Sequence, residues 1–511
     1  MKHFLSKFKI YFFIFLVYFP ILIIWDWDFW DGVSIDFAFR INDSMALHTL
    51  YSELGIPFQY YINEFLLFFS HLVGSFRIVY SIAVYVVVAF LFNSSLNVFN
   101  IVFNNKKIAA IGAFALVTFP AFHIVVSSVM FFHLFCFSLF MYAYSLLFQK
   151  KYFYFAIPVL FLSLQLNSLI TLNYSLLLLL ILQRRNFDKN NKYEYITLFF
   201  IPIIYYIVKM FIFKPYGLYV GYNSVKFHQL LEWTYIKKLV KYFYMSLNHF
   251  WFYTYFLVLV VSICSYFSKV KPLQKLFEIL ISLSMIFLSL LPYILAEKPP
   301  ISYVNDWDHR QGMLMALGFG YMVALIYRYF SQDYLNKKLQ FIILLIVTLN
   351  GVFLNILNWG WWIRAREDHL ISQQLVKLEI PHNSYIEYLN PLANRVYRYY
   401  ETSYLLGRAK QSFSYYSYGI RNIAIRKSHP KYYKQYVIEN FIESDKCFRI
   451  EGAYGPYYTI LNNIMSFSQF ILPAPDKADF YFSSYEIIPN HEVDQIKSNN
   501  LSLLPFECKP L

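Results

Sequence analysis

Apolar runs are the feature that most constrains how this chain folds. Runs of about 17–25 residues recur through roughly the first 360 positions, and each is long enough to cross a hydrocarbon core of about 30 Å as an α-helix. The composition points the same way, because 58% of the residues are hydrophobic and only 14% are charged. Soluble domains carry about 25% charged residues. The chain is therefore predicted to be a polytopic α-helical membrane protein, which excludes an ordinary soluble fold.

About eleven spans are predicted from apolar length. They lie near residues 8–25, 77–98, 108–122, 129–148, 152–166, 169–183, 195–213, 251–268, 275–296, 311–328 and 339–357. The regions 108–148 and 152–183 leave a second option open, in which each is one long broken segment. No small-residue cleavage site follows the first run, so we interpret it as a retained span rather than a signal peptide.

The basic residues test this map independently. With the N-terminus in the cytoplasm, every inward loop is basic, as the positive-inside rule requires. These loops contain Lys106, Lys107, Lys150, Lys151, Arg184, Arg185, Lys189, Lys192, Lys269, Lys271, Lys275, Arg328, Lys337 and Lys338. Much of the formal net charge of +14 is then explained by topology, and nucleic acid is not expected as a partner. The abundance of Phe, Tyr, Ile, Asn and Lys suggests an AT-rich bacterial genome, so we expect a bacterial cytoplasmic membrane.

The remainder of the chain, 364–511, is more polar and has no spanning run. An odd number of spans places it outside the cytoplasm, after a transmembrane domain over 1–363. Helical spacing in "REDHLISQQLVKLEI" and β-forming residues in "SYIEYL" and "ADFYFSSYEII" predict a small extracytoplasmic α/β domain. Cys447 and Cys508 would meet an oxidising compartment there, and the sequence leaves open whether they pair.

The stretch "WDWDFWDG", residues 25–32, directly follows the first apolar run. Its tryptophans are expected at a membrane–water boundary, where their amphipathic rings anchor at headgroup depth. Asp26, Asp28 and Asp31 need another explanation, because carboxylates at this position do not help orientation. A carboxylate held at such a boundary can deprotonate a hydroxyl or bind a divalent cation. The alternative is a solvated acidic loop.

Two outer loops are long and rich in aromatic residues. The first, 26–76, contains "ELGIPFQYYINEFLLFFSHLVG", in which Asn63, Glu64 and His71 interrupt an apolar pattern. This mixture predicts an amphipathic helix lying in the membrane interface, with Glu64 either in a site or on the wet face. The second, near 214–250, contains "EWTYIKKLVKYFYMSLNHFWF", which mixes aromatic residues with lysines in the same way.

The order of several motifs resembles that of the GT-C superfamily of membrane glycosyltransferases. The start of that family has an acidic residue after the first span, a Pro–aromatic segment before an interfacial helix, a glycine, and an arginine opening the second span. The matching residues are Asp26 or Asp28, Pro57, Phe58, Gln59, Tyr60, Tyr61, Gly74 and Arg77. "NNKKIAAIGAFALVTFPAF" is similar to the family's basic turn and third span. "DWDHRQGMLMALGFGYMVAL" is similar to its outer arginine segment, with Arg310 in the arginine position.

The resemblance implies an enzyme that moves a sugar from a polyprenyl-phosphate donor to an acceptor outside the cytoplasm, here a cell-envelope glycan or lipid. One of Asp26, Asp28 and Asp31 would act as general base on the acceptor hydroxyl, giving inversion. The donor phosphate needs cations near the membrane surface, and arginine suits this role through its bidentate fork. The candidates for phosphate binding are Arg310, Arg77 and Lys298.

Secondary candidates surround these residues. They are Asp306, Asp308, His309, Glu64, Tyr60 and Tyr61. A plain turn between spans is the competing interpretation for the acidic residues of 306–309. The loop before the fourth span offers His123 and His133 in place of an acid that the family often has there, and both are expected to pack or hydrogen-bond within the bundle. The family differs internally in its use of Mg²⁺ or Mn²⁺, so a divalent cation is left open as a cofactor.

Two other functions compete with this interpretation. An O-antigen-type polysaccharide polymerase or ligase is also polytopic and is fed by polyprenyl lipids, but its large soluble part typically lies between late spans. A transporter or flippase would need charged residues near mid-membrane and matching halves. This chain has few acidic residues within the predicted spans and no halves that match.

Overall fold

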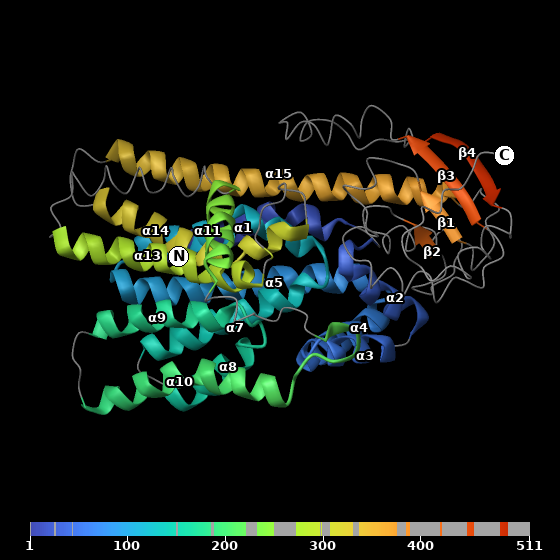
Figure 1. The fold of residues 1–511 in the computed structure, drawn as a ribbon. Helices are drawn as coiled ribbons and strands as arrows, with labels where there is room; N and C mark the ends of the chain where they lie inside the picture. Colours follow the sequence, from blue (N-terminus) through green and yellow to red (C-terminus); the bar gives the residue numbers. More distant parts are fainter. Residues whose placement is uncertain are drawn as a thin grey trace. The chain divides into compact units, whose positions relative to one another are not determined.

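The computed structural model describes residues 2–24, 27–42, 44–149, 152–184, 189–220, 232–249, 272–296, 298, 307–330, 337–375, 385–388, 419–421, 447–453 and 481–488. The chain divides into two compact units (Figure 1). The first unit consists of Met1–Leu22 and Met45–Asn358, and the second consists of Ile23–Ser44 and Trp359–Leu511.

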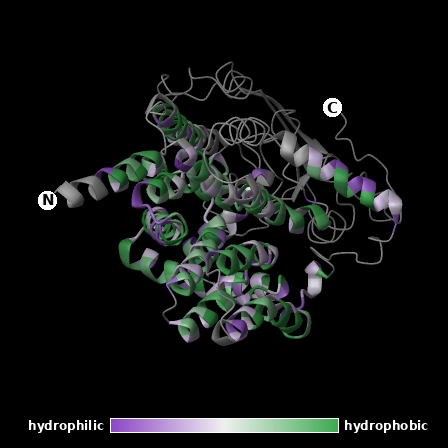
Figure 2. Cartoon of the chain, turned by 90° about the vertical axis from the view of Figure 1, so that its left-hand side faces the viewer, coloured by the Kyte–Doolittle hydropathy of each residue, from purple (hydrophilic) through white to green (hydrophobic). Residues whose placement is uncertain are grey.

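The first unit is built from α-helices, many of which are predominantly hydrophobic (Figure 2). They are α1 (Lys2–Leu22), α3 (Met45–Glu53), α4 (Pro57–Val73), α5 (Phe76–Phe103), α6 (Lys106–Val117), α7 (Met130–Phe148), α8 (Phe153–Ser163), α9 (Leu169–Arg184), α10 (Lys189–Phe211), α11 (Trp233–His249), α13 (Pro272–Leu295), α14 (Met315–Phe330) and α15 (Lys337–Leu375) as far as Asn358. Short 3₁₀-helices also occur, namely η2 (Pro120–Val126), η3 (Gly217–Tyr219) and η5 (Trp307–Gly312).

Several of these helices meet the requirements of a membrane span. Among the described residues, five are long and apolar enough, and a bent pair raises the number to six. They are Phe76–Phe103, Met130–Phe148, Lys192–Phe211, Phe277–Leu295 and Gln340–Trp362, with Lys106–Val117 and Pro120–Val126 as the bent pair. Shorter apolar helices cover Lys9–Leu22, Phe153–Ser163 and Leu169–Gln183. The prediction of a helical multi-pass membrane protein is confirmed at this level.

The predicted spans can be compared with these helices one by one. Each predicted segment overlaps a helix, except 251–268, which lies outside the described residues. The two ambiguous regions contain helix breaks, after Val117 and Ser163, which fit both separate spans and one long broken segment. The total of about eleven spans stays a prediction.

A break between α6 and η2 shapes the middle of the first unit. α6 begins at an N-cap, Asn105, whose side chain accepts hydrogen bonds from the backbone N–H groups of Lys107 and Ile108. The helix ends at Val117, and the chain bends by 53° into η2, which begins at Pro120. Proline has no backbone N–H to continue the helix, so the chain changes direction here. All residues of η2 are buried.

Glycine allows α6 and α14 to approach closely. A Cβ added to Gly320 would lie 2.6 Å from the Gly112 carbonyl oxygen, and one added to Gly112 would lie 2.8 Å from the Gly320 carbonyl oxygen. Small residues permit such backbone contact between helices in a membrane, where close van der Waals packing drives association. This contact fixes α14 beside α6, and η5 leads directly into α14.

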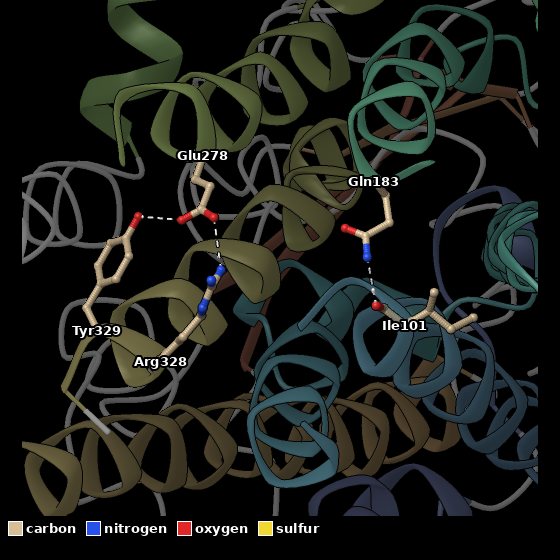
Figure 3. Close-up of polar contacts among 5 residues, drawn as sticks. All are labelled: Ile101, Gln183, Glu278, Arg328 and Tyr329. Atoms are coloured by element: carbon tan, nitrogen blue, oxygen red, sulfur yellow. Dashed lines mark hydrogen bonds and ion pairs between the residues drawn. The ribbon is translucent and has the colours of Figure 1, made fainter. Parts of the chain in front are cut away.

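The largely buried side chain of Glu278 joins α13 to α14 (Figure 3). The Glu278 carboxylate accepts hydrogen bonds from Arg328 Nη1 at 2.9 Å and from the Tyr329 hydroxyl at 2.7 Å. Figure 3 also shows a second polar contact, in which Gln183 Nε2 donates to the Ile101 carbonyl oxygen at 3.1 Å. Both partners of the ion pair are largely buried, so removing either charge would leave the other poorly solvated.

The second unit contains α2 (Val33–Ile41), η1 (Trp30–Gly32) and a four-stranded sheet. The strands are β1 (Tyr385–Tyr388), β2 (Gly419–Arg421), β3 (Cys447–Ala453) and β4 (Tyr481–Ile488), in the order β2-β1-β3-β4. β1 pairs in parallel with β2 and β3, whereas β3 and β4 are antiparallel. β1 and β4 lie in the two segments from which strands are predicted. The larger α/β domain stays a prediction, and Cys508 lies outside the described residues.

Gly320→Ala is expected to destabilise the first unit, because the new methyl carbon would lie 2.6 Å from a backbone oxygen and one helix must shift. The expected cost is about 1–3 kcal/mol, as for other overpacked cores. Gly360→Ala in α15 is the matched control, because nothing lies within 4 Å of its added carbon. Thermal unfolding in detergent should show a lower midpoint for Gly320→Ala only. Equal midpoints for the two variants would contradict the close approach of α6 and α14.

Candidate functional site

Arg77 is a fully buried cation at the beginning of α5. The helix is capped by Ser75, whose hydroxyl accepts a hydrogen bond from the Ile78 backbone N–H. Arg77 is 2% exposed, and its Cζ atom lies 5.2 Å from the centroid of the Tyr80 ring. A guanidinium over an aromatic face is held by cation–π attraction, which strengthens when water is excluded.

Tyr80 connects this arginine to η2. Its hydroxyl lies 2.8 Å from the Val125 carbonyl oxygen and 2.6 Å from the Ser127 carbonyl oxygen. These carbonyls lie at the end of η2, and that of Ser127 also accepts a hydrogen bond from the Met130 backbone N–H at 3.0 Å. The beginning of α5 and the end of η2 are therefore fixed to each other through one buried side chain.

Two buried histidines connect η2 to η5. His123 Nε2 and His309 Nδ1 lie 2.8 Å apart, and the rings are stacked with centroids 5.0 Å apart. The two side chains are 0% and 2% exposed. Because one nitrogen must donate and the other must accept, a single hydrogen lies between the rings. Protonating both rings would break the contact, so the pair holds at most one extra proton.

Arg310 follows His309 in η5 and is partly exposed. Its charge acts electrostatically on His133 at the start of α7 and on Tyr293 near the end of α13. The Tyr293 hydroxyl in turn donates to Ser168 Oγ at 3.2 Å. Arg310 thus lies where several helices of the first unit end.

We use the name arginine–histidine cluster for Arg77, Tyr80, His123, His309 and Arg310. The two arginines come from opposite ends of the transmembrane sequence, and η2 joins the groups around them. The cluster combines a buried guanidinium, a partly exposed guanidinium and a hydrogen-bonded imidazole pair. Such a set is suited to binding an anion, because arginine offers several donors in a planar fork.

Lys298 lies close to this region along the chain. It is partly exposed, and its backbone N–H donates to the Tyr293 carbonyl oxygen at 2.8 Å. Gln311, next to Arg310, is 2% exposed, and its side-chain oxygen has no hydrogen-bond partner in the described part of the chain. A buried acceptor of this kind favours a donor from a ligand or water.

The predicted aspartates belong to the second unit. Asp28 is 2% exposed, and its Oδ1 atom accepts a hydrogen bond from the Phe29 backbone N–H at 2.8 Å. Asp31 is partly exposed in η1, and its carbonyl oxygen accepts from the Ser34 hydroxyl at 2.6 Å. The Phe29 ring packs edge-on against Trp361, with centroids 5.0 Å apart. Asp26 lies outside the described residues.

The remaining predicted residues are distributed over two elements. Glu64 and Tyr61 are exposed on α4, and the Tyr60 hydroxyl donates to Glu64 Oε1 at 3.0 Å. Asp308 lies in η5, where only its backbone is described, and Asp306 lies outside the described residues. Among these secondary candidates, the structure places His309 in contact with His123 of η2.

α4 has the surface of a helix that contacts lipid. Its exposed large apolar residues are Tyr61, Phe65, Phe68, Phe69, Leu72 and Val73. Its buried face instead includes the polar residues Gln59, Asn63 and Ser70. A helix on a soluble protein shows the opposite distribution. This surface fits the interfacial position expected for α4.

The sequence predicts that His123 packs or hydrogen-bonds within the bundle, which agrees with its contact with His309, but it does not place His123 in the site. The available signal was a histidine three residues after Pro120, at a break between two apolar helices. Among the residues that the structure describes, no group of three or more His, Cys, Asp and Glu side chains is placed to hold a metal ion. Comparison with protein-family models, curated proteins and solved structures finds no match to this chain.

The histidine contact predicts strong coupling between His123→Phe and His309→Phe. Either single change leaves one buried imidazole without its partner, which costs about 1–3 kcal/mol. The double variant removes both groups, so we expect an interaction energy of about 0.5–3 kcal/mol in a double-mutant cycle. The cycle is measured by unfolding in detergent.

The control for this experiment is a second cycle that pairs His123→Phe with Gln183→Leu, because Gln183 hydrogen-bonds elsewhere, to Ile101. Those two effects should be additive within about 0.5 kcal/mol. Additivity in the His123–His309 cycle would show that the two rings do not support each other.

Proposed function

We propose that this chain is an integral membrane glycosyltransferase that moves a sugar from a polyprenyl-phosphate donor to a glycan or lipid acceptor of the cell envelope. In this proposal the fold is GT-C-like, with about eleven spans and a C-terminal α/β domain. The N-terminus is cytoplasmic, and the reaction takes place on the outer face of a bacterial cytoplasmic membrane.

The observation that carries the proposal is the arginine–histidine cluster. Arg77 contacts Tyr80, which is hydrogen-bonded to the end of η2, and Arg310 directly follows His309, which contacts His123 of η2. A donor phosphate carries negative charge that must be held beside hydrocarbon, and the guanidinium groups of Arg77 at the start of α5 and Arg310 in η5 would supply that compensation. The apolar helices around them offer surfaces on which a polyprenyl chain can pack.

The chemistry assigned to the aspartates is proton removal. As the acceptor oxygen attacks the anomeric carbon, its proton passes to a carboxylate and the bond from that carbon to the phosphate oxygen breaks. The polyprenyl phosphate leaves with the bonding electron pair, and the configuration at the carbon inverts. Arg77 and Arg310 stabilise the negative charge on the departing phosphate. A divalent cation stays open in this proposal.

Asp28 is our first choice for the base. Its burial and its hydrogen bond from Phe29 N–H hold the carboxylate in one orientation, and a fixed base is more effective than a mobile one. Asp31 is more exposed to solvent than Asp28 is. Asp26 is the third candidate.

Asp28→Asn is therefore expected to abolish one surface-glycan modification in cells while leaving the membrane abundance of the protein normal. The loss of a general base typically lowers the rate by about 10²–10⁴-fold. The measurement is glycan profiling of strains carrying Asp26→Asn, Asp28→Asn or Asp31→Asn, with immunoblots for abundance. Glu232→Gln, which alters an exposed carboxylate, is the matched control. Unchanged glycans in all three aspartate variants would refute the transferase proposal.

A further inference from the structure

α11 presents a narrow apolar line to its surroundings. Trp233, Val240 and Tyr244 are 66%, 63% and 61% exposed. Their spacing of seven and four residues places them on one face of the helix, one above the other. Large apolar side chains aligned in this way are unfavourable in water, so this line favours contact with an apolar phase.

Lysines follow the same face along one side of the line. Lys237 and Lys241 are exposed and four residues apart, which makes them neighbours on the helix surface. Neither forms an ion pair within the described part of the chain. Lys237 Nζ lies 5.6 Å from the centroid of the Trp233 ring. α11 itself contains no acidic residue, so its charge is not balanced within the helix.

The opposite face of α11 is fixed to α13. The Tyr235 hydroxyl donates to the Leu295 carbonyl oxygen at 3.2 Å, and the Phe243 ring packs edge-on against Phe287 with centroids 5.0 Å apart. α11 runs across the direction of α13 (Figure 1). Because one face is held by these contacts, the orientation of the other face is determined.

We infer that the basic aromatic face of α11, formed by Trp233, Lys237, Val240, Lys241 and Tyr244, binds the surface of an anionic phospholipid bilayer. The apolar line enters the boundary between headgroups and acyl chains, where tryptophan and tyrosine are favoured. The two lysines reach the lipid phosphates beside it. This inference does not depend on sugar transfer.

A bilayer fits this face better than an acidic protein segment does. The cations lie on one side of the apolar line, which matches the two layers that a helix meets when it lies at a membrane surface. The attraction between lysines and anionic headgroups decays within a Debye length. Binding should therefore weaken as salt is raised, while the helix stays attached to α13.

Hydrogen–deuterium exchange of the full chain in nanodiscs tests this inference. We expect the amides of α11 to exchange several-fold more slowly in nanodiscs that contain phosphatidylglycerol than in nanodiscs of phosphatidylcholine alone. The double variant Lys237→Gln/Lys241→Gln should lose this difference. The control variant Lys106→Gln/Lys192→Gln, which removes two exposed lysines elsewhere, should keep it. Exchange in α5 reports whether each variant is folded.

Three results would overturn the inference. The first is equal exchange of α11 in both lipids, and the second is a difference that persists in Lys237→Gln/Lys241→Gln. The third is protection that appears only when polyprenyl phosphate is added to phosphatidylcholine nanodiscs, which would assign the face to a lipid-linked substrate instead. Loss of glycan transfer in the aspartate variants has no bearing on these results, so the two proposals can fail separately.

Discussion

The helix break after Val117 leaves backbone carbonyl groups without helical partners in a region surrounded by apolar side chains. Water is not available there to replace the missing hydrogen bonds, and each unsatisfied group would be costly. Two tyrosines from other helices meet this need. The Tyr18 hydroxyl donates to the Val117 carbonyl oxygen at 2.7 Å, and the Tyr80 hydroxyl bonds the carbonyls at the end of η2. The break therefore ties α1 and α5 to the same short segment.

This satisfied break determines where functional groups meet. Tyr80 lies three residues, nearly one helical turn, after Arg77, so the bond that stabilises η2 also positions the arginine. His123, within η2, reaches His309 and thereby places η5 and Arg310. The close contact of Gly112 with Gly320 keeps α14 beside α6. One structural requirement, the saturation of buried carbonyls, thus connects η2 to α5, which carries Arg77, and the histidine contact connects η2 to η5, which carries Arg310.

Much of the bundle could be predicted from sequence because spans depend on apolar length alone. α5 was predicted near 77–98 and is observed over Phe76–Phe103. α15 illustrates what length cannot define, because the predicted span and the helical pattern that follows it form one helix, Lys337–Leu375. The arginines could be selected by chemistry and motif order.

The histidine contact could not be predicted, because its partners lie 186 positions apart and neither belongs to a recognisable motif. Its formation depends on the bend at Pro120 and on the packing of α6 against α14. The polar composition of the buried face of α4 could not be predicted either, because Gln59, Asn63 and Ser70 look like ordinary surface residues in the sequence. Tertiary packing decided both features.

The most direct test of a phosphate site at the arginine–histidine cluster is a binding measurement with the purified chain in nanodiscs. The ligand is a polyprenyl phosphate without an attached sugar. We expect saturable binding that is lost or at least tenfold weaker, about 1.4 kcal/mol, in Arg310→Gln. Lys192→Gln, which removes an exposed cation on α10, should bind as the unaltered chain does. Equal affinity of the unaltered chain and Arg310→Gln, or no binding by either, would contradict a phosphate site at the arginine–histidine cluster.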